Sequence, residues 1–343
     1  MESQLYTRHE NGDTVCRTCR HFCRIKPGER GVCGVRENRD GILVFLAFDK
    51  VIAASVDPIE KKPVFHLRPG SHSFSIATPG CNFRCDFCQN SDIAQMPNDQ
   101  SGLIQGRALP PEQIVAQAVD RGCESISYTY TEPTVFFELA YETARLANEK
   151  GLLNIFVTNG YMSPDLLNAM NGLMDAANVD LKAFDPGFYK TYCGARLKPV
   201  LENLRQMKQM GVLVEITTLL IPGLNDDSDQ LHSLAGFIAG DLGEETPWHI
   251  SRFHPCYRMT DRPVTPAASL DKAYDAGRKA GLKYVYIGNL PGNSREHTLC
   301  HSCGTVLISR HGYQVDSRIL AGPEGTGNCP ECSTRIHGIF YLD

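Results

Sequence analysis

Short runs rich in β-branched residues alternate with amphipathic segments between residues 72 and 287. This alternation predicts an α/β fold with a parallel sheet covered by helices. Periodicity alone does not choose between a doubly wound sheet and a barrel. The expected strands are 72–77, 124–128, 152–157, 176–182, 212–220, 247–253 and 283–287.

One intervening segment illustrates the expected helices. Ser163 can cap a helix, and Pro164 suits its first turn. Apolar residues then follow at helical spacing and predict one buried stripe. The stripe contains Leu166, Leu167, Met170, Leu173 and Met174.

Two regions lie outside the alternation. Residues 1–71 hold four cysteines, turn-forming residues and two expected strands near 42–48 and 51–56. Residues 295–343 hold four more cysteines and short β-like runs. We therefore expect an N-terminal Cys-rich metal-binding region (1–71), a core (72–290) and a C-terminal appendage (295–343), packed together without a long linker.

Composition excludes several classes of protein. With 42% hydrophobic residues in 343, the chain can bury a sizeable core and is not expected to be disordered. A formal net charge of −5 disfavours a broad nucleic-acid or membrane surface. The first residues lack the pattern of a signal peptide, and no long apolar run follows, so we expect a cytoplasmic protein without a membrane partner.

Cysteines are unusually frequent and clustered. The chain has fourteen, and spacings of two or three residues within a group suit thiolates that converge on a metal better than local disulfides. Three groups are formed by Cys16, Cys19, Cys23 and Cys33, by Cys81, Cys85 and Cys88, and by Cys300, Cys303, Cys329 and Cys332.

The middle group has the pattern C-x3-C-x2-C directly after the first expected core strand. Three thiolates can ligate three irons of a [4Fe-4S] cluster and leave the fourth iron open. Zinc knuckles usually carry cysteines in pairs, and ferredoxins supply four per cluster. An open iron can bind the amino and carboxylate groups of S-adenosylmethionine.

This motif is the signature of the radical SAM superfamily, which the chain resembles along essentially its whole length. The blocks 58–63, 88–90, 128–134 and 180–182 resemble the subgroup around pyruvate formate-lyase activating enzyme, and within it the radical SAM proteins of the AmmeMemoRadiSam system. The resemblance implies a partial (β/α)6 TIM-like barrel. It also implies an enzyme that reductively cleaves S-adenosylmethionine to a 5′-deoxyadenosyl radical.

The resemblance also implies which residues contact the cofactor, in addition to Phe87 within the cysteine motif. Tyr130 and Thr131 stand where relatives carry two glycines whose backbone binds the amino group of the cofactor, and Glu132 follows them. Glu132 can instead be a carboxylate in the first turn of a helix.

Further contacts are expected at three later strand ends. Thr158 and Asn159 resemble part of an Asp-Thr-Asn-Gly block, although Val157 replaces the aspartate, and a plain turn is the alternative. Asp180 and Lys182 share one side of a strand and suit the amino and carboxylate ends of the cofactor, or form a salt bridge. His254 corresponds to a histidine beside the adenosine, or is structural.

The remaining cysteines leave alternatives open. The C-terminal group predicts a zinc ribbon, with an iron–sulfur cluster as the rival. The N-terminal group can hold zinc or a second iron–sulfur cluster, and zinc is favoured. Cys123, Cys193 and Cys256 are expected to be structural; Cys193 and Cys256 are also candidates for a catalytic thiol.

Three functional hypotheses follow. The first is a radical SAM enzyme that removes hydrogen from an unidentified substrate, with flavodoxin or ferredoxin as electron donor. The second is an activase that acts on a glycyl-radical enzyme, and the third is a metal-binding adaptor without catalysis. The resemblance implies Memo-like and AMME-domain proteins as partners.

Overall fold

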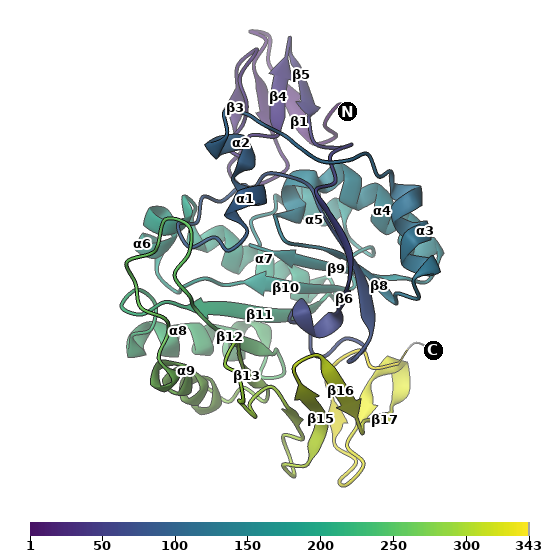
Figure 1. Cartoon of the computed structure of the whole chain (residues 1–343), viewed down its shortest axis with the longest axis vertical. Coiled ribbons are helices and arrows are strands. Elements are labelled where there is room, and N and C mark those ends of the chain that lie inside the picture. The colour runs from purple at the N-terminus through teal and green to yellow at the C-terminus, as the bar shows by residue number, and fades with distance from the viewer. Residues whose placement is uncertain (342–343) are drawn as a thin grey trace.

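Seven parallel strands lie side by side in the order in which they occur along the chain (Figure 1). The computed structural model describes residues 1–341. The expected ranges agree with the observed strands to within two residues at each end. The strands are β7 (His72–Ala77), β8 (Ser125–Tyr128), β9 (Leu153–Thr158), β10 (Ala176–Asp180), β11 (Leu213–Leu220), β12 (Trp248–Arg252) and β13 (Val285–Gly288).

Each of the first six parallel strands is followed by a helix that flanks the sheet (Figure 1). This arrangement confirms the partial barrel expected from the resemblance, with β13 as an additional strand. No helix in residues 1–341 is long and apolar enough to cross a membrane. The helices are α3 (Pro111–Asp120), α4 (Phe137–Glu149), α5 (Pro164–Ala169), α7 (Leu197–Gln209), α8 (Ser228–Phe237) and α9 (Ala267–Lys279).

Short helical turns fill the loops. They are η1 (Ile59–Lys61), α1 (Ser91–Ala94), α2 (Met96–Asp99), η2 (Pro133–Phe136), α6 (Pro186–Phe188), η3 (Tyr189–Cys193), η4 (Ile238–Leu242) and η5 (Pro323–Gly325).

Helix α5 confirms the predicted cap and corrects the predicted length. The Ser163 hydroxyl accepts a hydrogen bond from the Leu166 N–H at 3.1 Å. The helix ends at Ala169, and Gly172 then adopts a left-handed φ of 76°, which is typical of a chain leaving a helix. Met170 and Met174 are nevertheless buried, so most of the predicted apolar stripe packs in the core without continuous helix.

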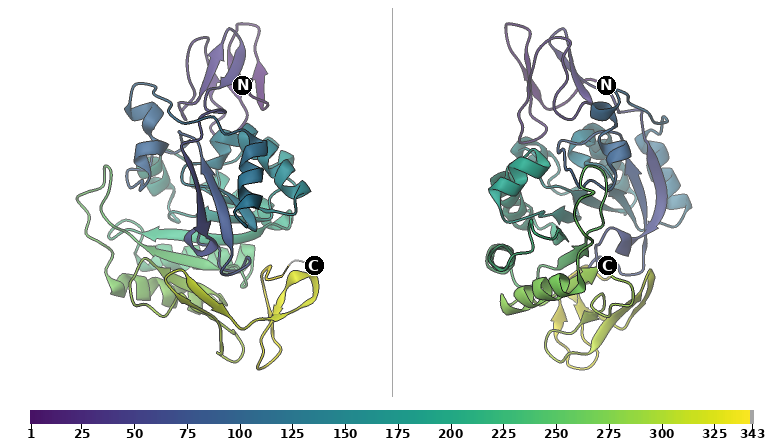
Figure 2. Two further views of the ribbon diagram at one scale, coloured as in Figure 1. Left: turned by 45° about the vertical axis from the view of Figure 1, so that its right-hand side comes forward. Right: turned by 60° about the vertical axis from the view of Figure 1, so that its left-hand side comes forward.

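The N-terminal residues form small sheets and one edge of the central sheet. Strand β6 pairs antiparallel with β7, although it precedes the boundary expected at residue 71. The other N-terminal strands lie at one end of the molecule (Figure 2). The N-terminal strands are β1 (Tyr6–Arg8), β2 (Thr14–Cys16), β3 (Arg24–Ile25), β4 (Arg36–Arg39), β5 (Ile42–Phe45) and β6 (Ala53–Pro58).

A buried ion pair joins the N-terminal region to the core. Arg36 on β4 and Glu138 on α4 lie 2.6 Å apart, and both side chains are almost completely buried. The backbone N–H of Ser163 donates to the Thr18 carbonyl nearby. The N-terminal region therefore covers the loops at the carboxyl ends of the first strands.

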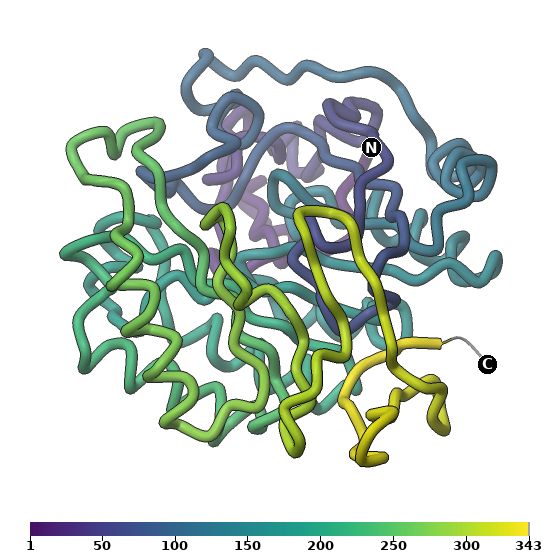
Figure 3. Tube along the Cα trace, turned by 60° about the horizontal axis from the view of Figure 1, so that its bottom comes forward, coloured from purple at the N-terminus to yellow at the C-terminus, as the bar shows by residue number. Residues whose placement is uncertain are grey.

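The C-terminal residues form two three-stranded sheets at the opposite end (Figures 2 and 3). Buried Arg310 donates to the Phe65 carbonyl at 2.9 Å, and the Ile339 N–H donates to the His66 carbonyl. This region therefore covers the amino ends of the parallel strands. Its strands are β14 (Thr298–Leu299), β15 (Val306–His311), β16 (Gln314–Ser317), β17 (Leu320–Ala321), β18 (Gly327–Asn328) and β19 (Arg335–Ile336).

Glu215 fixes the segment that supports this C-terminal region. The Glu215 carboxylate, on β11, is fully buried and accepts hydrogen bonds from the N–H groups of Phe65 and His66, at 3.0 and 2.8 Å. It also pairs with His249 at 2.6 Å. Burial opposes ionisation of Glu215, but hydrogen bonds from His249 and the backbone outweigh it and lower the pKa of the carboxyl.

We expect Glu215→Gln to lower the free energy of unfolding at pH 7 by about 1–3 kcal/mol, because two buried backbone donors lose a charged acceptor. The folded pKa lies below the unfolded value, so this stabilisation is complete above about pH 4.5 and is lost as pH falls through the folded pKa. Urea unfolding at pH 7 and in acid measures both effects. Glu10→Gln, at an exposed residue between β1 and β2, is the control, and equal stability of Glu215→Gln and the parent at pH 7 would contradict the prediction.

Candidate active site

A cavity of about 400 Å³ lies at the carboxyl ends of the parallel strands. Residues from the loops after β7, β8 and β9 line it, together with residues on or after β10, β11 and β12. Barrel enzymes assemble their active sites at this edge, because all parallel strands deliver their loops there.

Cys81, Cys85 and Cys88 all line this cavity, in the loop after β7. Residues around η3 hold the loop, since the Arg84 N–H donates to the Cys193 carbonyl at 2.9 Å and the Asp86 N–H to the Tyr192 carbonyl at 3.0 Å. The backbone of the loop that carries the three cysteines is therefore held in place by hydrogen bonds to the segment around η3, which does not line the cavity.

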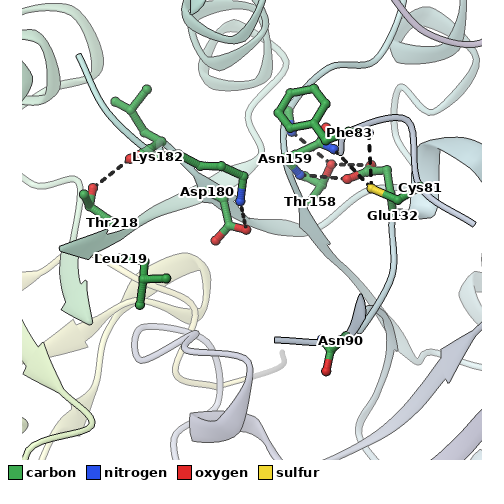
Figure 4. Close-up of polar contacts among 12 residues, drawn as sticks. Cys81, Phe83, Asn90, Glu132, Thr158, Asn159, Asp180, Lys182, Thr218 and Leu219 are labelled. Atoms are coloured by element: carbon green, nitrogen blue, oxygen red, sulfur yellow. Dashed lines mark hydrogen bonds and ion pairs between the residues drawn. The ribbon is translucent and has the colours of Figure 1, made fainter. Parts of the chain in front are cut away.

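Glu132 is a buried connector between two strand ends (Figure 4). One carboxylate oxygen accepts from the backbone and hydroxyl of Thr134 and from the Thr158 hydroxyl, and the other accepts from the Asn159 N–H at 2.8 Å. Burial raises the pKa of Glu132 although these four donors oppose it. Glu132 lines the cavity, as expected. It also caps the short helix η2, which matches the alternative of a carboxylate in the first turn of a helix.

The same contacts orient Asn159. Its side-chain amide donates to the Asn82 side-chain carbonyl at 2.7 Å, beside the Cys81 sulfur at 3.9 Å (Figure 4). Thr158 and Asn159 both line the cavity. A buried carboxylate thus links the β8 loop, the β9 loop and the cysteine loop.

Tyr130 keeps a backbone conformation that favours glycine. Its φ is 64°, in the left-handed region, and Asn90 donates to its carbonyl at 2.8 Å. Its hydroxyl donates to Asp57, which anchors the side chain. Thr131 is also fixed, because its hydroxyl donates to the Thr78 carbonyl at 2.8 Å.

Two lysines of the 58–63 block also line the cavity, and the sequence assigned them no role. The amino groups of Lys61 and Lys62 lie 2.8 and 2.6 Å from the Asp57 carboxylate. The Lys62 amino group lies 4.4 Å from the centre of the Tyr130 ring. Burial lowers the pKa of Lys62 to about 8 in spite of Asp57. Nothing in their spacing indicated this position, because it depends on the pairing of β6 with β7, which places η1 and Lys62 after β6.

Asp180 and Lys182 line another side of the cavity and form an ion pair of 2.8 Å (Figure 4). Burial acts to lower the pKa of Lys182, but Asp180 outweighs it and holds that pKa well above its usual value. Asp180 keeps 38% of its side chain exposed, so the pair is open to a ligand. Thr217, paired with Asp180 across β10 and β11, lines the cavity with a buried hydroxyl that has no partner among the described residues.

Some predicted residues lie elsewhere. Phe87 lines the cavity, but His254 is exposed and is not among the lining residues. Cys193 is fully buried, and the Cys256 thiol donates to the Phe87 carbonyl at 3.4 Å. Neither thiol lines the cavity, although the Cys193 thiol hydrogen bonds to the thiol of Cys85, which does. Cys123 is buried, as expected for a structural residue.

The four C-terminal cysteines converge closely. The sulfurs of Cys300 and Cys332 are 3.6 Å apart, and those of Cys303 and Cys329 are 3.7 Å apart. Tetrahedral zinc with bonds of about 2.3 Å to sulfur separates its thiolates by about 3.8 Å. These cysteines can therefore close around one metal ion.

The four N-terminal cysteines line a second cavity together with His21. The imidazole of His21 contacts the Asn82 carbonyl at 2.8 Å, so this imidazole bridges to the cysteine loop.

Comparisons with known proteins show what the chain is similar to. The model of the radical SAM superfamily matches residues 75–235. An uncharacterized protein of Methanocaldococcus jannaschii is 44% identical over 335 residues, which is 98% of each chain. The pyruvate formate-lyase-activating enzyme of Streptococcus mutans is 26% identical over 171 residues, covering 48% of this chain and 65% of the relative. The structure of Streptococcus suis SuiB bound to S-adenosylmethionine has a TM-score of 0.48 and 16% identity, covering 67% and 53% of the two chains.

Proposed function

Because this chain belongs to the radical SAM superfamily, we propose that it cleaves S-adenosylmethionine at a [4Fe-4S] cluster held by Cys81, Cys85 and Cys88. The observation that carries the proposal is that these three cysteines line one cavity with the Asp180–Lys182 pair. When bound, the cluster supplies the electron that breaks the cofactor into methionine and a 5′-deoxyadenosyl radical. That radical would abstract hydrogen from an unidentified substrate.

The chemistry of the cavity fits these groups. Three thiols suit three irons and leave the fourth iron for the amino and carboxylate groups of the cofactor. The cavity is large enough for a small ligand, and the buried Thr217 hydroxyl lacks a partner within residues 1–341. A buried hydroxyl without a partner costs free energy, which a bound ligand can recover.

We assign the charged ends of the cofactor to one ion pair. Lys182 neutralises the carboxylate, and Asp180 accepts a hydrogen bond from the amino group or the ribose. The contact between Asp180 and Lys182 also fits the alternative considered from the sequence, a salt bridge without a ligand. The partial exposure of the Asp180 side chain supports contact with a ligand instead.

The backbone around Tyr130 supports a further contact. Relatives carry glycines there, and Tyr130 retains a left-handed φ that glycine adopts readily. Since the side chains of Tyr130 and Thr131 are held by Asp57 and by the Thr78 carbonyl, the backbone remains the part available to the amino group of the cofactor. Glu132 acts by positioning Thr158 and Asn159.

We further propose that the protein belongs to the AmmeMemoRadiSam subgroup, with Memo-like and AMME-domain proteins as partners. The sequence blocks around residues 58–63 and 128–134 support this assignment. A low-potential flavodoxin or ferredoxin would supply the electron. The similarity to a pyruvate formate-lyase-activating enzyme supports an activase as the second candidate, whereas the intact cysteine loop disfavours a non-catalytic adaptor.

The proposed activity is tested directly with reconstituted protein. With dithionite and without air, the parent should convert S-adenosylmethionine to 5′-deoxyadenosine, and alanine at any of Cys81, Cys85 or Cys88 should abolish the reaction. Product is measured by chromatography, with Cys123→Ala as the control cysteine variant. Full activity of a triple-alanine variant would refute the proposal.

Lys182→Ala tests where the cofactor binds. A charge-assisted hydrogen bond is worth about 1.5–3 kcal/mol, so affinity for S-adenosylmethionine should fall about ten- to a hundred-fold. The iron content should not change, because Lys182 does not ligate iron. A cofactor titration measures the effect, with exposed Lys198→Ala as the control. Unchanged affinity at equal iron content would mean that the pair is only a salt bridge.

Zinc analysis tests the C-terminal site. The full chain should contain zinc that is lost in the double variant Cys303→Ala/Cys332→Ala. Thiolate-bound zinc contributes on the order of 10 kcal/mol to folding in small domains, so the melting temperature of the variant should fall. Cofactor cleavage per cluster should persist, because this site lies at the opposite edge of the sheet. Iron in place of zinc at this site would identify an iron–sulfur cluster there and contradict the assignment.

A further inference from the structure

The two groups of four cysteines differ in how closely their sulfurs approach. Within residues 1–341, only Cys300, Cys303, Cys329 and Cys332 place three or more ligand atoms within 4.8 Å of one another. No three sulfurs of the N-terminal group (Cys16, Cys19, Cys23 and Cys33) therefore lie within 4.8 Å of one another, although the four residues line one cavity. One zinc ion draws four sulfurs close together, whereas a [4Fe-4S] cluster places each thiolate on a separate iron.

The cysteine loop of the active site provides an internal comparison. Cys81, Cys85 and Cys88 also line one cavity, and their three sulfurs do not all lie within 4.8 Å of one another. In the superfamily this motif holds a [4Fe-4S] cluster. The N-terminal group and this loop therefore share one feature that separates them from the C-terminal group, since neither brings three ligand atoms within 4.8 Å of one another. This step rests on the function proposed above.

A buried guanidinium supplies the second observation. Arg36 lines the N-terminal cavity and is 1% exposed. Its terminal nitrogens donate to Glu138, Ser3 and the Val135 carbonyl, but its Nε has no hydrogen-bond partner among the described residues. An unpaired buried N–H suits donation to a sulfur of the site, and hydrogen bonds to sulfur tune the potentials of iron–sulfur clusters.

The surroundings of the N-terminal cysteines are largely apolar. Ile25, Val32 and Val135 contribute apolar surface to the cavity, which excludes water. Asn82, next to Cys81, lines the same cavity, as does Thr134, which hydrogen bonds to Glu132. The wall of the N-terminal cavity is therefore formed in part by residues that also build the active site.

We infer that Cys16, Cys19, Cys23 and Cys33 hold a second [4Fe-4S] cluster, where the sequence favoured zinc. The protein then carries two clusters on the carboxyl edge of the sheet and one zinc site on the amino edge. The nearness of the two clusters follows from Asn82 and His21, which join the two cysteine groups through one hydrogen bond.

Metal counts of the anaerobically reconstituted full chain test the inference without any substitution. Two clusters and one zinc site predict about eight iron, about eight sulfide and about one zinc per chain. About four iron and about two zinc would overturn the inference. This count does not depend on cofactor cleavage, so an inactive protein with about eight iron would refute the proposed function and leave the second cluster standing.

Two variants assign the iron to its site. Cys81→Ala/Cys85→Ala/Cys88→Ala should retain about four iron, with visible absorption that dithionite bleaches. Cys19→Ala/Cys23→Ala should lose about four iron and keep its zinc. Retention of all iron with loss of one zinc in the second variant would show that the N-terminal site binds zinc and would overturn the inference.

Discussion

The parallel hydrogen-bonding pattern from β7 to β13 is the constraint on which the rest of the structure depends. Because each strand pairs with the one before it in the same direction, all carboxyl ends lie at one edge and all amino ends at the other. The cysteine loop, the Glu132 connector and the Asp180–Lys182 pair share the first edge. The C-terminal cysteines pack at the second edge, so the sheet separates the proposed chemistry from this cysteine group.

Sequence patterns predicted the central sheet well because its strands are short, buried and bounded by turn-forming residues. They predicted less where the outcome depends on contacts distant in sequence. The apolar spacing after Ser163 indicated a longer helix than α5, since burial of Met170 and Met174 does not require helical backbone. Strand β6 was assigned to the N-terminal region because its pairing with β7 leaves no periodic signal.

The site was predictable where a motif carries its own chemistry. Cys81, Cys85 and Cys88 follow a spacing that specifies three thiolates. Asp180 and Lys182 pair as their spacing indicated, although β10 ends at Asp180 and Lys182 lies in the loop that follows. The partners of Glu132 were not predictable, because Thr158 and Asn159 approach it only through the parallel packing of β8 and β9. Lys62 and Thr217 were missed because their positions depend on the pairing of β6 with β7 and of β10 with β11. The contact expected for His254 stays a prediction.

The ion pair between Arg36 and Glu138 has a consequence for the autonomy of the core. A chain that began at residue 72 would keep Glu138 inside α4 but would lose the guanidinium that neutralises it. A buried carboxylate without its partner is strongly destabilising. The same deletion would remove β6 and leave the backbone groups of β7 unpaired at an exposed edge. Removal of residues 1–71 is therefore expected to destabilise the barrel.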